Sequence, residues 1–269
     1  MQTRALIAVL LLPSAVFACV WLDGTTLDGR IQRRKGVNLA EALRHVMEEK
    51  PWLQTTEAKF GKVKNKGDAD AVEEQAVKKI LTGETRAAIE MLQDSEKRWP
   101  GRYSTAANLG TAYELSRDNE NALKWISTGI ERNGQSHYGT EWLHVLILKT
   151  KLEAEKHPKT PLPSRMLNLP EQFGDKTLVN VDGKDHSISE IREALAYQLN
   201  ERMLFVKPKD VYVADLLYSL AVIQANIDSV EAALDLLKLS RQYGFVDEPL
   251  LQRREQQYAT VLAATKKRR

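Results

Sequence analysis

Apolar residues recur at three- and four-residue intervals along much of this chain, a spacing that places them on one face of an α-helix. An early apolar stripe consists of Leu39, Leu43, Val46 and Met47. Asn38 and Glu41 before and within it resemble a capping box, and Pro51 ends the pattern. A broader apolar face starts near residue 138 and contains Trp142, Leu143, Val145, Leu146, Ile147 and Leu152. The pattern predicts a protein built mainly from helices.

The helical pattern is interrupted between residues 157 and 189. His157–Lys176 contains Pro158, Pro161, Pro163 and Pro170, which predicts a long loop. Short apolar runs then flank Asp182-Gly183, a pair typical of the type I′ turn of a β-hairpin. Ser187 with Glu190 predicts the capped start of a helix that runs to about Leu204.

Three blocks of 34 residues, at 69–102, 103–136 and 214–247, share one arrangement of small and apolar positions. The middle block carries it in Leu109-Gly110, Tyr113, Ala122-Leu123, Ile126 and Gly129. The last block has Leu220-Ala221, Ala233-Leu234, Leu237 and Ser240, and the first has Ala76, Gly83, Ala88-Ile89, Leu92, Ser95 and Pro100. Small residues at fixed offsets let paired helices approach closely, while larger apolar side chains fill the space beside them.

In this spacing, residues 69–156 and 190–265 resemble tetratricopeptide repeats, with departures at Gln75, Lys79 and Gln224. The resemblance implies an all-α solenoid of helical hairpins, here interrupted by a long loop and a small β-hairpin. A generic helical bundle is the alternative, and it is also all-α. The chain then divides into a signal peptide (1–18), a tether or strap (19–37), an N-terminal helical region (38–156), the insertion (157–189) and a C-terminal helical region (190–269).

The resemblance also implies a concave groove, lined by the first helix of each repeat, that binds a peptide or a partner helix. The groove positions of the first two blocks are Asp70, Glu73, Val77, Ile80, Ser104, Ala107, Thr111 and Glu114. Those of the last block are Asp215, Tyr218, Val222 and Ala225. We take Ala107, Thr111, Glu114, Tyr218 and Val222 as candidate partner-binding residues, with ordinary packing between repeats as the alternative. The set lacks the Lys/Asn pattern by which chaperone-binding members of this family hold a terminal carboxylate.

The first eighteen residues have the layout of a secretory signal peptide. Arg4 supplies the positive charge, Ala5–Leu12 the apolar segment, and Ala18 the small residue before the cut. Cleavage at Ala18–Cys19 fits the general signal peptidase, and Val16-Phe17-Ala18-Cys19 also resembles the lipobox of bacterial lipoproteins. The sequence therefore predicts export to the periplasm, with Cys19 either a lipid anchor or a plain thiol near the mature N-terminus.

Composition and charge narrow the functional classes. The chain has 43% hydrophobic and 28% charged residues, as in ordinary globular proteins. Its formal charge of +3 gives no electrostatic case for a nucleic-acid partner. A single cysteine excludes intrachain disulfides and cysteine-rich metal sites. The basic end, Lys266-Lys267-Arg268-Arg269, is either a solvated helix terminus or a contact for anionic lipid.

No motif recommends an enzyme, a cofactor or a metal. The five histidines include no i, i+4 pair, and His137 and His144 lie too far apart along one helix to share an ion. Nucleophile-elbow, phosphate-loop and dinucleotide-binding motifs are missing from the sequence. An enzymatic role would gain support if Asp182, Asp185 and His186 clustered around a pocket.

The leading hypothesis is therefore an exported, non-enzymatic scaffold for protein–protein interaction. The alternative is a structural or assembly factor of the cell envelope that has no peptide groove. In either case the partners would be a protein or peptide and, through the possible lipid at Cys19, the membrane.

Overall fold

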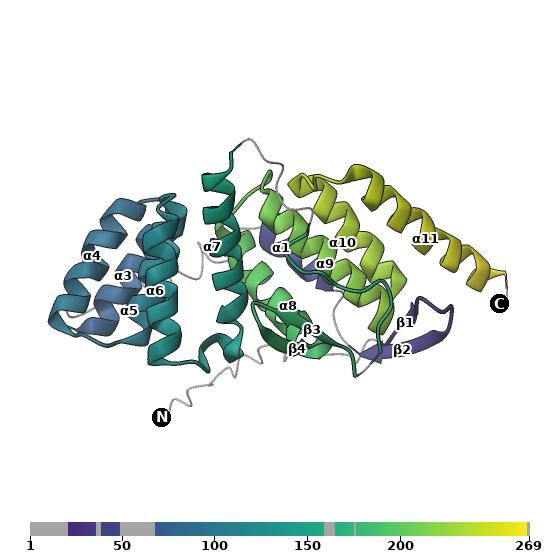
Figure 1. Ribbon diagram of the computed structural model, residues 1–269, viewed down its shortest axis with the longest axis horizontal. Helices are drawn as coiled ribbons and strands as arrows, with labels where there is room; N and C mark the ends of the chain where they lie inside the picture. The colour runs from purple at the N-terminus through teal and green to yellow at the C-terminus, as the bar shows by residue number, and fades with distance from the viewer. Residues whose placement is uncertain (1–20, 36–38, 49–67, 159–164, 175, 268–269) are drawn as a thin grey trace, which may run out of the picture.

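The computed structural model describes residues 21–35, 39–48, 68–158, 165–174 and 176–267. These residues form ten α-helices, one short 3₁₀ helix and two antiparallel β-hairpins, so the protein is all-α in its main architecture (Figure 1). The predicted signal peptide, the Ala18–Cys19 bond and the last two arginines lie outside the described residues. None of the described helices is both long enough and apolar enough to cross a membrane.

Four antiparallel helices form the first array: α3 (Ala69–Leu81), α4 (Thr85–Arg98), α5 (Tyr103–Leu115) and α6 (Asn119–Arg132). Each packs on the next, and α3 also touches α5 (Figure 1). Short turns join these helices. Gly83 takes a φ of 83° between α3 and α4, which glycine adopts without strain. Asp118 caps α6 by accepting a hydrogen bond from the Asn121 amide.

The predicted insertion follows η1 (Ser136–Gly139) and α7 (Glu141–Lys156). Residues 165–174 are without regular structure, and β3 (Leu178–Val181) then pairs with β4 (Lys184–Ser187). Asp182 and Gly183 have φ values of 51° and 83°, as a type I′ turn requires. Ser187 and Glu190 form the predicted capping box at the start of α8 (Ile188–Phe205). The hairpin and the cap predicted from the sequence are confirmed.

The second half of the protein surrounds α9 (Val211–Ile227), in which every residue from 213 to 225 is buried. Helices α8 and α10 (Val230–Tyr243) pack on it, α1 (Leu39–Glu48) packs on α8 and α10, and α11 (Glu248–Lys266) packs on α10. The apolar stripe of α1 joins this core through Leu43 and Met47. Although α1 precedes the first array in sequence, it therefore packs with the C-terminal helices.

Residues 19–37, which the sequence suggested as a tether or strap, contain a β-hairpin of β1 (Trp21–Thr25) and β2 (Ile31–Lys35). The hairpin is attached to the α9–α10 turn and to α10. Thr25 donates hydrogen bonds from its backbone amide and its hydroxyl to Glu231, at 2.9 and 2.8 Å. The Leu27 amide donates to the Ala225 carbonyl at 3.0 Å. The strands were not predicted because these fixing contacts come from residues about two hundred positions away.

Two helical glycines test how tightly α5 and α6 pack. A Cβ added at Gly110 would lie 2.5 Å from side-chain carbons of Ile126 and 3.1 Å from its backbone nitrogen. Gly110→Ala should therefore lower the free energy of unfolding by about 1–2 kcal/mol, although alanine favours a helix by about 1 kcal/mol over glycine. Urea denaturation measures the change.

Gly129→Ala is the matched control, because the nearest atom to its added Cβ, the Ala107 nitrogen, is 3.7 Å away. This variant should be unchanged or more stable by up to about 1 kcal/mol. Equal effects of the two substitutions would contradict the close α5–α6 approach.

Candidate functional site

A cavity of about 210 Å³ lies between the first helical array and the α7–α8 region. Its apolar wall consists of Val77, Ile80, Ala107, Leu115, Ile126, Phe205 and Val206. Its polar wall consists of Tyr103, Ser104, Asn108, Thr111, Glu114, His137, Glu141, His144, Tyr197, Gln198, Glu201 and Arg202. The cavity is therefore bounded by α3, α5 and α6 on one side, and by η1, α7 and α8 on the other.

Most of the predicted groove positions of the first two repeat blocks line this cavity: Val77, Ile80, Ser104, Ala107, Thr111 and Glu114. Three of the five candidate partner-binding residues, Ala107, Thr111 and Glu114, thus meet in one place. The other two groove positions, Asp70 and Glu73, bind Arg102 instead. These residues converge because the spacing along α3 and α5 places each set on one face of its helix.

The prediction that the remaining candidates, Tyr218 and Val222, line an open groove is wrong. Both are buried in the core of the second half. The segment that follows α7 covers this part of α9. Arg165 donates to Asp215 from Nε at 2.9 Å, and the Met166 amide donates to the same carboxylate at 2.8 Å. The chain itself thus occupies the groove positions of α9, which excludes an external partner from them.

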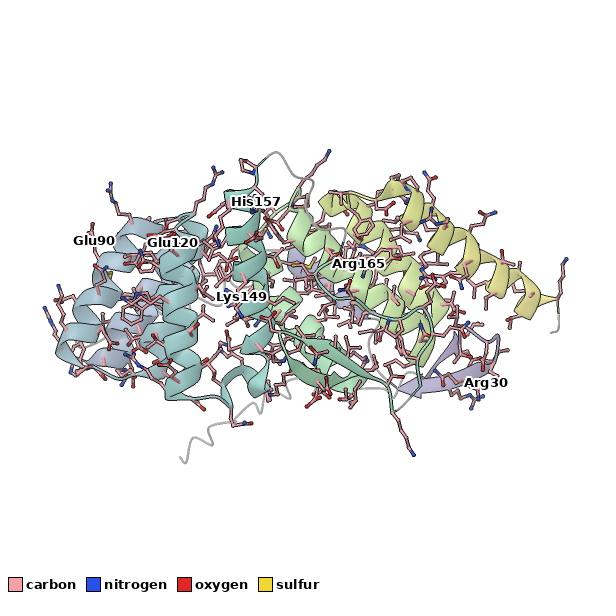
Figure 2. The ribbon with its side chains drawn as sticks, in the orientation of Figure 1. Arg30, Glu90, Glu120, Lys149, His157 and Arg165 are labelled. Carbon is pink, nitrogen blue, oxygen red and sulfur yellow. The ribbon has the colours of Figure 1, made fainter. Side chains whose placement is uncertain are left out.

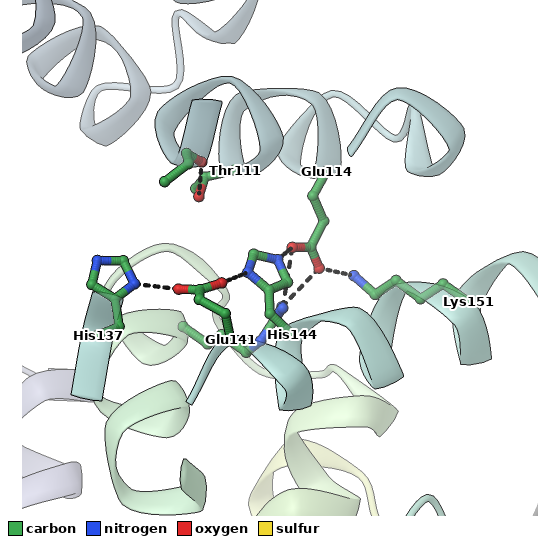
Figure 3. A network of polar contacts seen from close by, with 8 residues as sticks. Thr111, Glu114, His137, Glu141, His144 and Lys151 are labelled. Atoms are coloured by element: carbon green, nitrogen blue, oxygen red, sulfur yellow. Dashed lines mark hydrogen bonds and ion pairs between the residues drawn. The ribbon is translucent and has the colours of Figure 1, made fainter. Parts of the chain in front are cut away.

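A cluster of buried charges forms the floor of the cavity around Glu114 (Figure 3). Arg202 donates to both carboxylate oxygens, Nη1 to Oε1 at 2.7 Å and Nη2 to Oε2 at 3.1 Å. Lys151 Nζ donates to Oε1 at 2.7 Å, and His144 Nε2 lies 2.7 Å from Oε2. These four residues come from α5, α7 and α8. We call them the Glu114 network.

The Glu114 network changes the ionisation of its members. Burial alone would raise the pKa of Glu114, but Arg202, His144 and Lys151 outweigh it and hold this pKa well below its ordinary value. Burial and the charge of Arg202 oppose protonation of His144. Contacts with Glu114 and Glu141 outweigh both and raise the pKa of His144. The charged forms of Glu114 and His144 are therefore mutually stabilised in the folded protein.

Glu141 extends the polar contacts toward η1. Its Oε2 lies 3.4 Å from His144 Nδ1, and its Oε1 contacts His137 Nδ1. Despite burial, hydrogen bonds with the two histidines lower the pKa of Glu141 to about 2. His137 Nε2 lies 2.9 Å from the Tyr103 hydroxyl. His137 and His144 both contact this carboxylate, a pairing that was not predicted from the sequence.

An aromatic group lies at the η1 end of the cavity. The His137 ring stacks on Tyr197 with centroids 5.1 Å apart, and the Tyr138 ring meets the edge of Tyr197 at 5.9 Å. His137 and Tyr138 both hold left-handed backbone conformations, with φ values of 48° and 58°. Such strain in bulky residues is usually kept where the surroundings over-determine it.

Glu201, one helical turn after Tyr197 on α8, also lines the cavity. Burial and the nearby charge of Glu141 raise its pKa, and His137 offsets this only in part. Its carboxylate has no hydrogen bond or ion pair with any other described residue. Neither Glu201 nor Tyr197 was found from the sequence, because α8 lies outside the three repeat blocks.

The hairpin residues that would have supported an enzyme do not line the cavity. Asp182 pairs with Lys149 at 2.7 Å (the latter labelled in Figure 2), Asp185 accepts from Asn180, and His186 stacks on Trp142 at 4.1 Å. Nor do the described ranges of the chain hold any group of three or more histidine, cysteine or acidic side chains arranged for a metal ion.

Comparison with known proteins adds no assignment: no protein-family model, curated protein or solved structure matches the chain.

The Glu114 network predicts a pH dependence of stability. Because the folded-state pKa of His144 is raised, its proton stabilises the folded protein below the ordinary pKa. That contribution is lost as the pH rises through the folded-state pKa. The difference in unfolding free energy between the wild type and His144→Gln should therefore be larger at about pH 5.5 than at about pH 9 in urea denaturation.

His157→Gln at the end of the same helix is the control, since this side chain is 60% exposed. It should change the free energy of unfolding by less than about 0.5 kcal/mol at both pH values. A gap for His144→Gln that stays constant or widens at high pH would contradict the raised pKa.

Proposed function

We propose that this chain is a tetratricopeptide-like interaction scaffold that binds a peptide or partner helix in the cavity between the first helical array and α8. One observation carries the proposal: six residues chosen from their repeat positions alone line one cavity. A generic bundle gives no reason for the groove positions of two separate helices to meet around an open space.

The regular spacing of the helices in the first array supports the interpretation that they form repeats. Helices α3 and α5 begin at Ala69 and Tyr103, and α4 and α6 begin at Thr85 and Asn119, each 34 residues later. The helix ends keep the same offset. A period of 34 residues is that of tetratricopeptide repeats.

The covered face of α9 supports the mode of binding. Residues 165–169 lie on the groove positions of the last repeat block as an irregular segment, fixed by polar contacts to Asp215 and by the buried side chain of Leu167. A partner peptide would use the same kinds of contact on α3 and α5, where the chain leaves a cavity.

The polar floor fits a structural role better than a catalytic one, so we propose a non-enzymatic function. Both oxygens of Glu114 are fully engaged by Arg202, Lys151 and His144. The Thr111 hydroxyl donates to the Ala107 carbonyl (Figure 3). A carboxylate bound through both oxygens by three side chains holds the walls of a binding site in place.

Export and anchoring belong to the same proposal and depend on the sequence alone. The described fold begins at Trp21, two residues after Cys19. Since a residue spans about 3.5 Å at most, a lipid on Cys19 would keep the β1–β2 hairpin close to the membrane surface.

Selection from a displayed library of dodecapeptides tests the groove. The mature chain should enrich peptides whose affinity falls by about tenfold or more on Ala107→Arg and on Thr111→Phe, because both substitutions fill the cavity. Fluorescence polarisation with the enriched peptides measures the affinities, and circular dichroism checks that each variant is folded.

Ala259→Arg, on an exposed position of α11, is the control for added charge and should leave the affinities unchanged. Failure to enrich any peptide, or equal binding to the wild type and to folded Ala107→Arg and Thr111→Phe, would remove the groove proposal.

Cys19→Ala tests the anchor separately. In a bacterial host, the wild type should fractionate with membranes and incorporate labelled palmitate, because the diacylated cysteine inserts into the bilayer. The variant should lose both properties. Equal fractionation of the two proteins without label would leave an exported protein that has no lipid.

A further inference from the structure

The acidic side chains at the groove positions share one feature: each is bound by an arginine. Glu73 accepts from Arg102 at 2.7 Å, Glu114 from Arg202 at 2.7 Å and Asp215 from Arg165 at 2.9 Å. Among the carboxylates of the cavity wall, Glu141 is held by His137 and His144, whereas Glu201 has no hydrogen bond or ion pair with another described residue. No arginine or lysine among the described residues bonds to it.

The contacts of Arg165 show how a buried carboxylate of this protein is paired. Its guanidinium lies 3.9 Å above the Tyr218 ring, and its Nε and Nη2 donate to Asp215 and Ser219, both at 2.9 Å. Asp215 and Tyr218 are one helical turn apart on α9. A carboxylate and an aromatic face on adjacent turns thus hold one guanidinium.

A tyrosine and a carboxylate again lie one turn apart on α8, in the reverse order: Tyr197 and Glu201, which both line the cavity. His137 and Tyr138 contact the Tyr197 ring, and Tyr103 contacts the ring of His137. Burial, together with the charges of Glu201 and Glu141, raises the pKa of the Tyr197 hydroxyl. Arg202, the nearest cation in sequence, has both terminal nitrogens on Glu114.

We propose that Tyr197 and Glu201 form a recognition site for an arginine side chain of the bound peptide. This inference deepens the proposed groove function and rests on it. The aliphatic part of the arginine would lie along Phe205 and Ala107, with the guanidinium between the tyrosine face and the carboxylate. An acidic side chain of the peptide is disfavoured because Lys151 and Arg202, the cations of the cavity floor, already bind Glu114.

Two synthetic pentapeptides test the site: acetyl-Leu-Ala-Arg-Ala-Leu-amide and the same peptide with citrulline, the uncharged isostere of arginine. On the wild type, the arginine peptide should bind about tenfold more tightly by isothermal titration calorimetry, because only it pairs with Glu201. Glu201→Gln should abolish this preference. Glu193→Gln removes the same charge from an exposed position of the same helix and should keep it.

Tyr197→Leu should reduce the preference but not abolish it, since it removes the aromatic face and leaves the carboxylate. Equal affinity of the two peptides on the wild type, no binding of either, or an unchanged preference in Glu201→Gln would overturn the arginine site. Equal affinities that are both lost in Ala107→Arg would overturn it while the groove proposal stands. The library selection fails independently if the groove itself is wrong.

Discussion

The ion pair between Glu114 and Arg202 fixes how α8 meets the first helical array. It joins α5 to α8 across 88 residues of sequence. The apolar clusters on either side are largely separate: one is built on α3, α4 and α5, and the main one on α1 and α7–α11. Phe205, at the end of α8, contributes to the first cluster and strengthens the same junction. A third apolar cluster, formed by Ala122, Ile126 and Leu148, joins α6 to α7. Residues from each of these contacts, Ile126, Glu114, Arg202 and Phe205, line the cavity.

A junction between helices that depends on buried charges restricts their arrangement more than an apolar junction does. Burying a carboxylate and a guanidinium costs several kcal/mol per ion, and their attraction repays this only with good geometry and additional hydrogen bonds. Here Lys151 and His144 supply those bonds from α7. Apolar side chains could slide over one another at similar energy, whereas Glu114 is satisfied only when α5, α7 and α8 meet in one arrangement. We interpret the network as a device that fixes the walls of the cavity.

What could be predicted from the sequence was local. Helical periodicity, the Asp182-Gly183 turn and the Ser187 cap each depend on residues a few positions apart, and all agree with the structure. The face that α3 and α5 present follows from helical phase, which is why Ala107, Thr111 and Glu114 were placed together correctly. Tyr218 occupies an equivalent phase, but a segment fifty residues earlier covers it. The β1–β2 hairpin and Arg202 escaped prediction for the same reason, since distant partners define them.

The two carboxylate–tyrosine pairs, Asp215 with Tyr218 and Glu201 with Tyr197, have opposite outcomes in the fold. On α9 the pair is completed by Arg165, the nearby segment is fixed, and this face becomes part of the core. On α8 Glu201 is also largely buried, but no described arginine or lysine pairs with it, and His137 offsets the effect of burial on its pKa only in part. A buried carboxylate that has no matched cation adds nothing to the stability of the free protein. It gains a favourable partner only when a cation enters the cavity. The free energy of that pairing therefore contributes to selective binding and not to folding.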